Sequence, residues 1–327
     1  MHVITDLSSG GAERTLTRLV LAAKREGYRQ AVVCLSDGGF YADTLRQGGV
    51  DLYCLGLANV WHFPVGLYRL TRLVRKLRPK LMMTWLYHAD LIGTLAAILS
   101  GLGPRRVVWN VRCSDIDFSN YKTLTRLIAK MLAWISHLPW AVATNSGAGR
   151  HAHTKLGYRP RQWIYLPNGL DTTEWRACAS MRSSVRSELG FSEENTVVGM
   201  VARLDPQKDH ATLLAAADTL LKDLIGRGTE TIEAPHVLCL GERSDVSRLI
   251  KAFDIAVLCS AYGEGFPNVV AEAMATELPC IVTDVGDAKV LVGDTGWVIP
   301  TKNPGALAEA IARLQSESEL ERKQRGL

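Results

Sequence analysis

The chain has 327 residues, of which 47% are hydrophobic and 22% charged, with 28 glycines and 12 prolines. This composition excludes disordered and fibrous proteins, and the length predicts two domains. No apolar run reaches the roughly 18 residues of a membrane-spanning helix. The first residues lack the basic-then-apolar layout of a secretory signal, so we expect a cytoplasmic protein. The seven cysteines are scattered without ligand spacing, which predicts reduced thiols and no metal site.

The charge is unevenly distributed. Residues 1–167 carry 22 Lys and Arg against 9 Asp and Glu, a net charge of +13, whereas residues 168–327 carry 16 against 24, a net charge of −8. A basic half favours an anionic partner such as a phosphate-bearing substrate or a lipid surface. Nucleic acid is disfavoured, because the sequence has no recognition-helix pattern, zinc spacing or aromatic RNA-binding stripe.

Short β-rich runs alternate with amphipathic stretches, which predicts βαβ units and parallel sheets. In the first half we expect strands at 2–5, 30–35, 50–55, 80–85, 106–111, 141–144 and 162–166. In the second half we expect strands at 196–201, 237–240, 254–259, 279–283 and 296–299, and helices at 210–222, 246–253, 268–276 and 304–315. The predicted fold class is therefore α/β, with two doubly wound, Rossmann-like domains facing across a cleft.

A Pro-Asn-Gly turn at 167–169 separates the two series of elements. We place the boundary there, between a domain 1–167 and a domain 168–327. The connection 223–236 is too short for the strand and helix that a doubly wound domain would usually add. Either the second domain is reduced or residues are missing there, and residues 224–228 could be the end of that strand with its glycine loop.

The strongest motif begins at Gly263 and reads Gly-Glu-Gly-Phe-Pro-Asn up to Asn268. It follows an apolar strand and opens a helix in whose first turn Pro267 is expected, so its amides and helix dipole suit a diphosphate. Glu264 and Glu272 are expected to point carboxylates at a hydroxyl-rich ligand. The alternative is a strand–helix loop with two solvated glutamates.

Two further loops follow predicted strands. Arg203 and Lys208 lie five residues apart and are expected to converge on one point, where cations would stabilise a departing nucleoside diphosphate; the alternative is two surface charges. Gly10 and Gly11 predict a tight turn that brings a helix N-terminus to a phosphate or acceptor. The G-x-G-x-x-G dinucleotide fingerprint is absent there.

These motifs occur in the same order and register as in the family-4 retaining glycosyltransferases of the GT-B fold, which the chain resembles over nearly its whole length. The likeness is greatest to members that build bacterial surface polysaccharides. The resemblance implies that Arg203 and Lys208 bind the donor diphosphate, that Glu264 contacts the donor sugar and that Glu272 contacts the ribose. It also implies a donor-binding segment of Gly265, Phe266, Pro267, Asn268, Val269 and Val270, with Gly10 and Gly11 beside the phosphates or acceptor.

The sequence departs from this pattern at one place. Many relatives carry a histidine where this chain has Arg112, whose guanidinium cannot act as a base but could bind a phosphate or an acceptor hydroxyl. An ion pair with Asp115 is the alternative role. His88 is the nearest substitute for the histidine, and a structural role is the alternative for it.

Two basic stretches, 66–80 and 121–136, combine Lys and Arg with leucines at helical spacing. They predict peripheral contact with an anionic membrane, with solvated helices as the alternative. The hypothesis is a cytoplasmic, membrane-associated retaining glycosyltransferase. It would move a sugar from a UDP- or GDP-sugar to a glycan or polyprenyl-diphosphate-linked acceptor, with no metal or other cofactor. The alternatives are a non-catalytic binding subunit of the same fold and a nucleotide-sugar epimerase.

Overall fold

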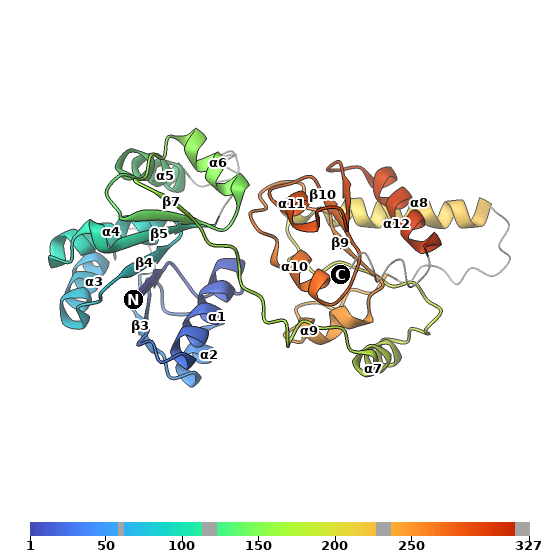
Figure 1. Ribbon diagram of the computed structural model, residues 1–327, viewed down its shortest axis with the longest axis horizontal. Helices are drawn as coiled ribbons and strands as arrows, with labels where there is room; N and C mark the ends of the chain where they lie inside the picture. The colour runs from blue at the N-terminus through green and yellow to red at the C-terminus, as the bar shows by residue number, and fades with distance from the viewer. Residues whose placement is uncertain (58–61, 113–122, 227–236, 318–327) are drawn as a thin grey trace. The chain divides into compact units, whose positions relative to one another are not determined.

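The computed structural model describes residues 1–57, 62–112, 123–226 and 237–317 (Figure 1). The chain forms two compact units, Met1–Gly169 and Leu170–Leu327. The division between them lies after Gly169, at the end of the Pro-Asn-Gly turn and two residues beyond the predicted boundary. Within the described ranges, no helix is both long enough and apolar enough to cross a membrane.

The first unit is built on a parallel sheet of seven strands in the order β3-β2-β1-β4-β5-β6-β7. All seven strands of the first half were predicted, and the structure trims most of them at the ends. They are β1 (His2–Ile4), β2 (Ala31–Cys34), β3 (Asp51–Cys54), β4 (Met82–Trp85), β5 (Val107–Val111), β6 (Ala141–Thr144) and β7 (Trp163–Tyr165). The order reverses between β1 and β4, which places a topological switch point at the carboxyl ends of these strands.

Helices cover both faces of this sheet (Figure 1). On one face lie α1 (Gly11–Arg25) and α2 (Ala42–Gln47), and on the other lie α3 (Phe63–Leu77), α4 (Tyr87–Ser100), α5 (Thr123–Ile135) and α6 (Gly147–Leu156). Successive strand residues therefore enter different cores: Val3 packs with the α3–α6 layer and Ile4 with the α1–α2 layer. This two-sided burial explains why the strands read as continuous apolar runs.

Asp90 lies in the first turn of α4 and is fully buried. The Thr84 hydroxyl donates a hydrogen bond to its Oδ1 at 2.5 Å, and Oδ2 has no partner within the described residues. Burial disfavours the ionised carboxylate and raises the pKa of Asp90 to about 8. The folded protein therefore holds a proton at neutral pH that the unfolded chain releases.

Because folding raises the pKa of Asp90, we expect this residue to make the free energy of unfolding depend on pH. Asp90→Asn should remove that contribution. Because the pKa is raised on folding, the contribution of Asp90 to stability is fully present below pH 4. It is lost by about 1.4 kcal/mol per pH unit as the pH rises toward 8. Urea unfolding at pH 6 and pH 9 should show a smaller pH difference for the variant than for wild type. The exposed acid Asp51 supplies the control, Asp51→Asn, and parallel profiles for wild type and Asp90→Asn would contradict the prediction.

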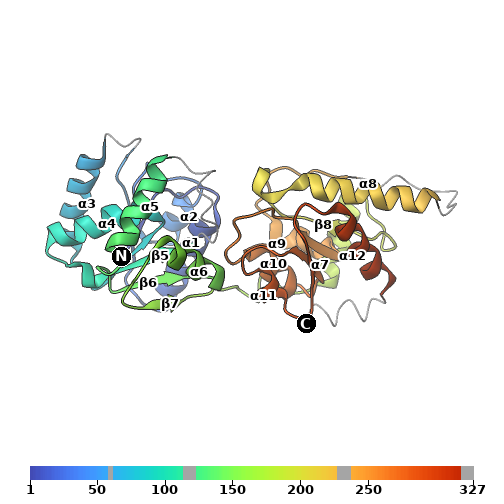
Figure 2. The same ribbon diagram turned by 90° about the horizontal axis from the view of Figure 1, so that it is seen from above.

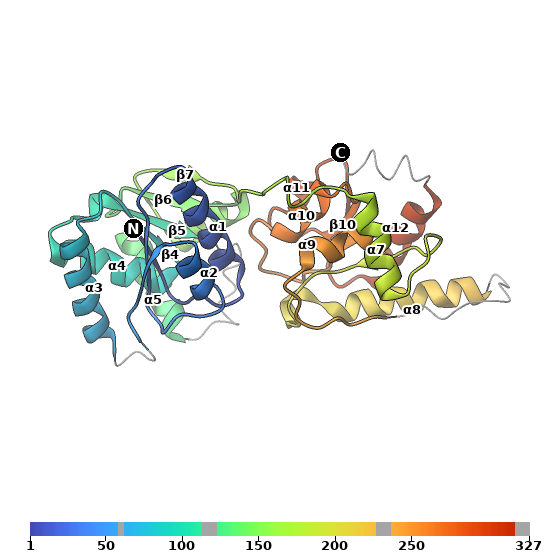
Figure 3. The ribbon, with the colours of Figure 1, turned by 90° about the horizontal axis from the view of Figure 1, so that it is seen from below.

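The second unit has a parallel sheet of four strands in the order β11-β10-β9-β8. These are β8 (Val198–Gly199), β9 (Ile255–Leu258), β10 (Cys280–Thr283) and β11 (Trp297–Ile299). One face is covered by α8 (His210–Gly226) and α12 (Pro304–Ser316), the other by α9 (Val246–Leu249), α10 (Asn268–Ala275) and α11 (Ala288–Val292), as Figures 2 and 3 show. Helix α7 (Ala179–Leu189) packs against α9 and the 3₁₀ turn Ile250–Ala252. On β9, Ile255 and Val257 face α8 and α12, whereas Ala256 and Leu258 face α10 and α11.

In this unit one predicted strand does not form, one suggested strand end is helical, and one predicted strand is shorter than expected. Residues 237–240 form no strand: Val237 and Leu238 are exposed, and the neighbouring β8 has only two residues with which a further strand could pair. Residues 224–226, interpreted as the end of a strand, continue helix α8. The predicted strand 196–201 is reduced to β8, and α7 and α11 were not predicted at all. Residues 227–236 lie outside the described ranges.

Candidate active site

The side chain of Glu264 lies in the loop between β9 and α10, at the carboxyl edge of the second sheet. It is 6% exposed. The Lys208 ammonium donates to its Oε1 and forms an ion pair with it, and the Ser260 hydroxyl donates to the same oxygen at 2.5 Å. The Thr283 hydroxyl at the end of β10 in turn donates to the Ser260 carbonyl at 2.7 Å. The carboxylate is therefore held in a fixed position by two donors from two different loops.

Two glycines allow the loops around Glu264 to approach closely. Gly263 has φ +78°, and a Cβ there would lie 2.7 Å from the Gln207 side-chain nitrogen. Gly286, in the loop after β10, has φ +62°, and a Cβ there would lie 1.9 Å from the Glu264 carbonyl oxygen. Backbone hydrogen bonds complete the contact, from Ala261 N to Gln207 O at 2.8 Å and from Asp287 N to Gly265 O at 3.1 Å. Both glycines are therefore required by geometry.

Helix α10 begins directly after this loop. Pro267 is its N-cap, with φ −74° and ψ 100°, and Asn268 is the first helical residue, so the prediction that Pro267 lies inside the first turn was wrong by one position. Within the described part of the chain, no side-chain hydrogen bond caps this end. The positive end of the helix dipole is thus left uncapped beside Lys208 and Glu264.

The two predicted cations differ in their surroundings. Lys208 ends a short 3₁₀ turn, Pro206–Lys208, which the Asp205 carboxylate caps by accepting from Gln207 N at 2.8 Å. Its ammonium is mostly buried against Glu264. Arg203 is exposed, and no ion pair or side-chain hydrogen bond from it reaches another described residue. The structure therefore joins Lys208 to Glu264 and leaves the convergence of Arg203 on Lys208 a prediction.

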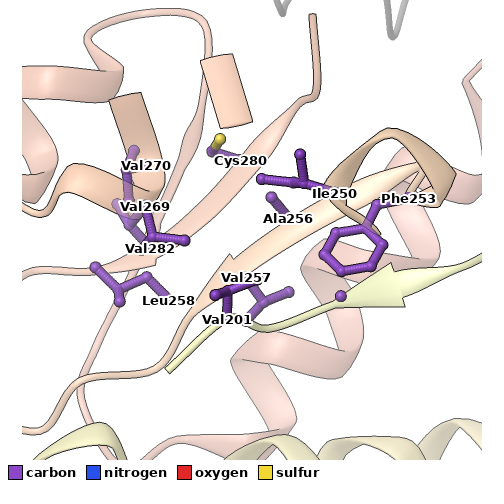
Figure 4. A pocket seen from close by; sticks show the side chains of 11 residues that line it. Val201, Ile250, Phe253, Ala256, Val257, Leu258, Val269, Val270, Cys280 and Val282 are labelled. Carbon is purple, nitrogen blue, oxygen red and sulfur yellow. The ribbon is translucent and has the colours of Figure 1, made fainter. Parts of the chain in front are cut away.

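Glu272 lies on the buried side of α10, and its side chain is only 1% exposed. Its neighbours Val270 and Ala273 are buried as well. The expectation of a carboxylate open to a ligand is not met in this state. Val269 and Val270 also line a small apolar pocket between α10 and the sheet, shown in Figure 4. Because its lining is aliphatic and aromatic apart from the Cys280 thiol, that pocket does not suit a charged nucleotide.

In the first unit, the loop after β1 differs from the predicted tight turn. Gly10 has an extended conformation, with φ −106° and ψ 168°, and is the N-cap of α1. A Cβ at Gly10 would lie 2.1 Å from a carboxylate oxygen of Glu13, in the first turn of α1. The glycine is therefore needed because the buried Glu13 side chain turns back toward the helix end; Gly11 is the first helical residue.

Arg112 follows β5 at the carboxyl edge of the first sheet. Its guanidinium lies 4.8 Å from the Trp85 ring centroid and donates to the side-chain oxygens of Asn110, at 2.8 Å from Nε, and Asn168. Burial lowers the pKa of Arg112 to about 10, which leaves it charged at neutral pH. Its partners Asn110 and Asn168 are neutral, and the predicted partner Asp115 lies outside the described residues. The cation is therefore held by amides and an aromatic face.

His88 lies in the first turn of α4, at the same edge of the first sheet. Leu86 is the single residue between β4 and α4. It has φ +71°, a strained conformation for a residue that is not glycine, and this allows the chain to pass directly from the strand into the helix. Partial burial lowers the pKa of His88, so the imidazole is neutral at neutral pH. Its ring hydrogen-bonds no other described residue, and its contact with a ligand stays a prediction.

The sequence reasoning missed three residues of these sites: Ser260, Gly286 and Asn168. Ser260 lies one residue beyond the predicted strand 254–259, Gly286 lies three residues beyond the predicted strand 279–283, and Asn168 was interpreted only as a turn residue. The signal for the first two was their position, since each lies just beyond a predicted parallel strand and therefore at the ligand-binding edge.

Two α/β units that are each built on a parallel sheet, the second with a Lys–Glu pair beside a helix N-terminus, are typical of glycosyltransferases of the GT-B fold. The chain belongs to Glycosyltransferase Family 4, whose family model matches residues 9–174. A second model, glycosyl transferases group 1, matches residues 195–317. The predicted fold class and family are confirmed.

Similar proteins agree with this assignment. The chain is 24% identical over 320 residues to the Escherichia coli UDP-Gal:alpha-D-GlcNAc-diphosphoundecaprenol alpha-1,3-galactosyltransferase, a match covering 88% of this chain and 80% of the relative. It is 28% identical over 216 residues to the putative glycosyltransferase EpsF of Bacillus subtilis, covering 61% of this chain but only 56% of EpsF. Among solved structures, Anabaena HepE in complex with UDP and glucose is 22% identical with a TM-score of 0.80, covering 100% of this chain and 92% of HepE.

Proposed function

We propose that this glycosyltransferase moves a sugar from a nucleoside diphosphate sugar to a glycan or lipid-linked acceptor in the assembly of a bacterial surface polysaccharide. The pairing of Lys208 with the buried Glu264 beside the α10 N-terminus carries the proposal. The E. coli relative, which is named for a diphosphoundecaprenol acceptor, supports a lipid-linked acceptor. UDP in the HepE complex supports a UDP-sugar donor.

The second unit would bind the donor. Lys208, Arg203 and the first-turn amides of α10 would contact the diphosphate, Glu264 the sugar, and Glu272 the ribose. Lys208 can keep its ion pair and still contact a phosphate oxygen, because an ammonium has three N–H donors. As the bond from the anomeric carbon to the diphosphate oxygen breaks, negative charge grows on the leaving group, and these cations would stabilise it without a metal.

The first unit would bind the acceptor. Arg112 has N–H groups beyond those given to Asn110 and Asn168 and would bind an acceptor phosphate or hydroxyl. His88, Gly10 and Gly11 lie at the same sheet edge. The acceptor oxygen would attack the anomeric carbon on the face that the diphosphate leaves. Its proton would pass to a diphosphate oxygen. Attack on the same face that the leaving group departs from would give retention of configuration.

Arg203→Ala tests the donor assignment. Because Arg203 is exposed and forms no ion pair or side-chain hydrogen bond with another described residue, the variant should unfold like wild type and yet bind UDP or GDP about tenfold more weakly, the loss of one charge-assisted hydrogen bond. Thermal shifts with UDP, GDP, ADP and their sugars measure this, and Arg176→Ala removes an exposed arginine elsewhere in the unit as control. Unchanged nucleotide affinity would refute the assignment, and donor binding without transfer to lipid-linked acceptors would favour the non-catalytic alternative.

We further propose that the enzyme acts at the inner face of the cytoplasmic membrane. All six basic residues of segment 66–80 are exposed, while Leu70 and Val74 of α3 pack in the core, so this helix offers mainly charge to a surface. Attraction to anionic headgroups supports the proposal and should weaken with salt. In segment 121–136, Lys122 lies outside the described residues and Lys130 is exposed.

A further inference from the structure

Helix α5 presents large apolar side chains to solvent along one side. Leu124 is 38% exposed, Leu127 64%, Met131 38% and Trp134 81%. Their spacing of three or four residues places them on one stripe of the helix, which we call the α5 stripe. The opposite side of α5 is also apolar and is buried in the first core, through Ile128, Ala129, Leu132 and Ala133.

This arrangement is unlike that of the other basic helix. An amphipathic helix of a globular protein buries its apolar side and exposes polar residues, as α3 does with its exposed Arg and Lys. Helix α5 has already buried one apolar side against α4 and the sheet, so the α5 stripe is not needed for the core. A contiguous exposed apolar surface of this kind marks an interaction site.

The charges around the α5 stripe favour one partner. Residues 118–170 contain no Asp or Glu, and Lys130 is exposed beside Leu127 and Met131 on α5. A second copy of this chain would bring the same uncompensated cations together, at an electrostatic cost. An anionic lipid surface instead offers headgroups to Lys130 and an acyl boundary to the α5 stripe. Tryptophan at such a boundary is the residue that membranes favour.

We propose that α5 lies in the plane of an anionic membrane, with the α5 stripe inserted at the boundary of headgroups and acyl chains. The inference rests on the membrane contact under Proposed function and extends it, since α3 would attach mainly by charge and α5 by insertion. Insertion makes part of the attachment independent of salt, because burial of apolar surface is not screened.

Vesicle binding of the full chain tests the insertion. With phosphatidylglycerol–phosphatidylcholine vesicles, we expect wild type to stay partly bound at 1 M NaCl and its tryptophan fluorescence to be quenched by brominated acyl chains. The variant Leu127→Ser with Trp134→Ser should lose at least about tenfold in salt-resistant partitioning and most of the quenching. Both positions are exposed, so the variant should keep its UDP affinity. Val65→Ser with Tyr68→Ser, exposed apolar residues of α3, supplies the control and should behave like wild type.

Each outcome bears on a different statement. Suppose that wild type binds anionic vesicles, but that high salt releases wild type and both double variants completely and to the same extent. Insertion is then wrong and the charge-based contact stands. If wild type does not bind these vesicles at any salt while it still binds UDP, both membrane proposals fail and the donor site stands. Sedimentation of a lipid-free dimer that Leu127→Ser with Trp134→Ser converts to monomer would assign the α5 stripe to a second copy and overturn the inference.

Discussion

Lys208→Met is expected to lower kcat/KM for glycosyl transfer by about 10² to 10³-fold, the loss typical of removing one preorganised donor from a developing negative charge. The lysine would supply charge to the leaving diphosphate, and it also neutralises Glu264, which is almost buried. Without it, the Ser260 hydroxyl is the remaining side-chain donor to this carboxylate among the described residues. We therefore also expect a loss of up to about 3 kcal/mol in unfolding free energy. Steady-state kinetics and urea denaturation measure the two effects.

The matched partner variant separates these effects. Glu264→Gln keeps the shape of the side chain but removes the charge, so the double variant with Lys208→Met should be more stable than Lys208→Met alone and equally inactive. Full activity in Lys208→Met would show that the ammonium is not part of the donor site. A double variant no more stable than Lys208→Met would show that the ion pair carries no coupling energy.

Gly286→Ala is expected to lower activity at least about 100-fold by displacing Glu264, because small misplacements of reacting groups have effects of that size. The new Cβ would lie 1.9 Å from the Glu264 carbonyl oxygen, and φ is +62°, so the backbone must move. Gly286 itself is not among the predicted donor-binding residues, so the loss would come through Glu264. Transfer assays and thermal unfolding with and without UDP check the result.

Gly190→Ala is the control for the backbone cost. Gly190 has φ +79° and nothing within 4 Å of an added Cβ, so alanine there has the left-handed penalty of about 1 kcal/mol but no clash. Its activity should match wild type. If Gly286→Ala were as active as Gly190→Ala, the position of Glu264 would not depend on the loop after β10.

Periodicity predicted most of this fold because parallel strands covered on both faces read as unbroken apolar runs. This pattern holds for the inner strands of the first unit and for β9 and β10 of the second, whereas the edge strands β3 and β7 are partly exposed. Residues 237–240 have the same composition and yet form no strand, since a strand needs a partner and β8 offers two residues. Local pattern alone does not reveal whether that partner exists.

The site could be predicted only in part. Glu264 and Lys208 were found from motif and loop position, and the structure joins them. Their partners were not found, because the contact between Gly286 and Glu264 depends on three-dimensional neighbours 22 positions apart. Likewise, a conformational reason was expected for Gly10, whereas the actual reason is the Glu13 side chain. Burial of Glu272 depends on how α10 is rotated about its axis, which a motif does not specify.

The three loops at the carboxyl edge of the second sheet contact one another. An ion pair joins Lys208 to Glu264, and backbone hydrogen bonds join Ala261 to Gln207 and Asp287 to Gly265. Directed evolution toward a new donor would therefore gain little by randomising these loops, since a change in one disturbs the other two. Within these loops, substitutions should be tolerated best at single exposed positions such as Leu204, whose side chain is 93% exposed. Leu204 lies between Arg203 and Lys208 in the sequence. A library placed there would retain the scaffold while altering what surrounds it.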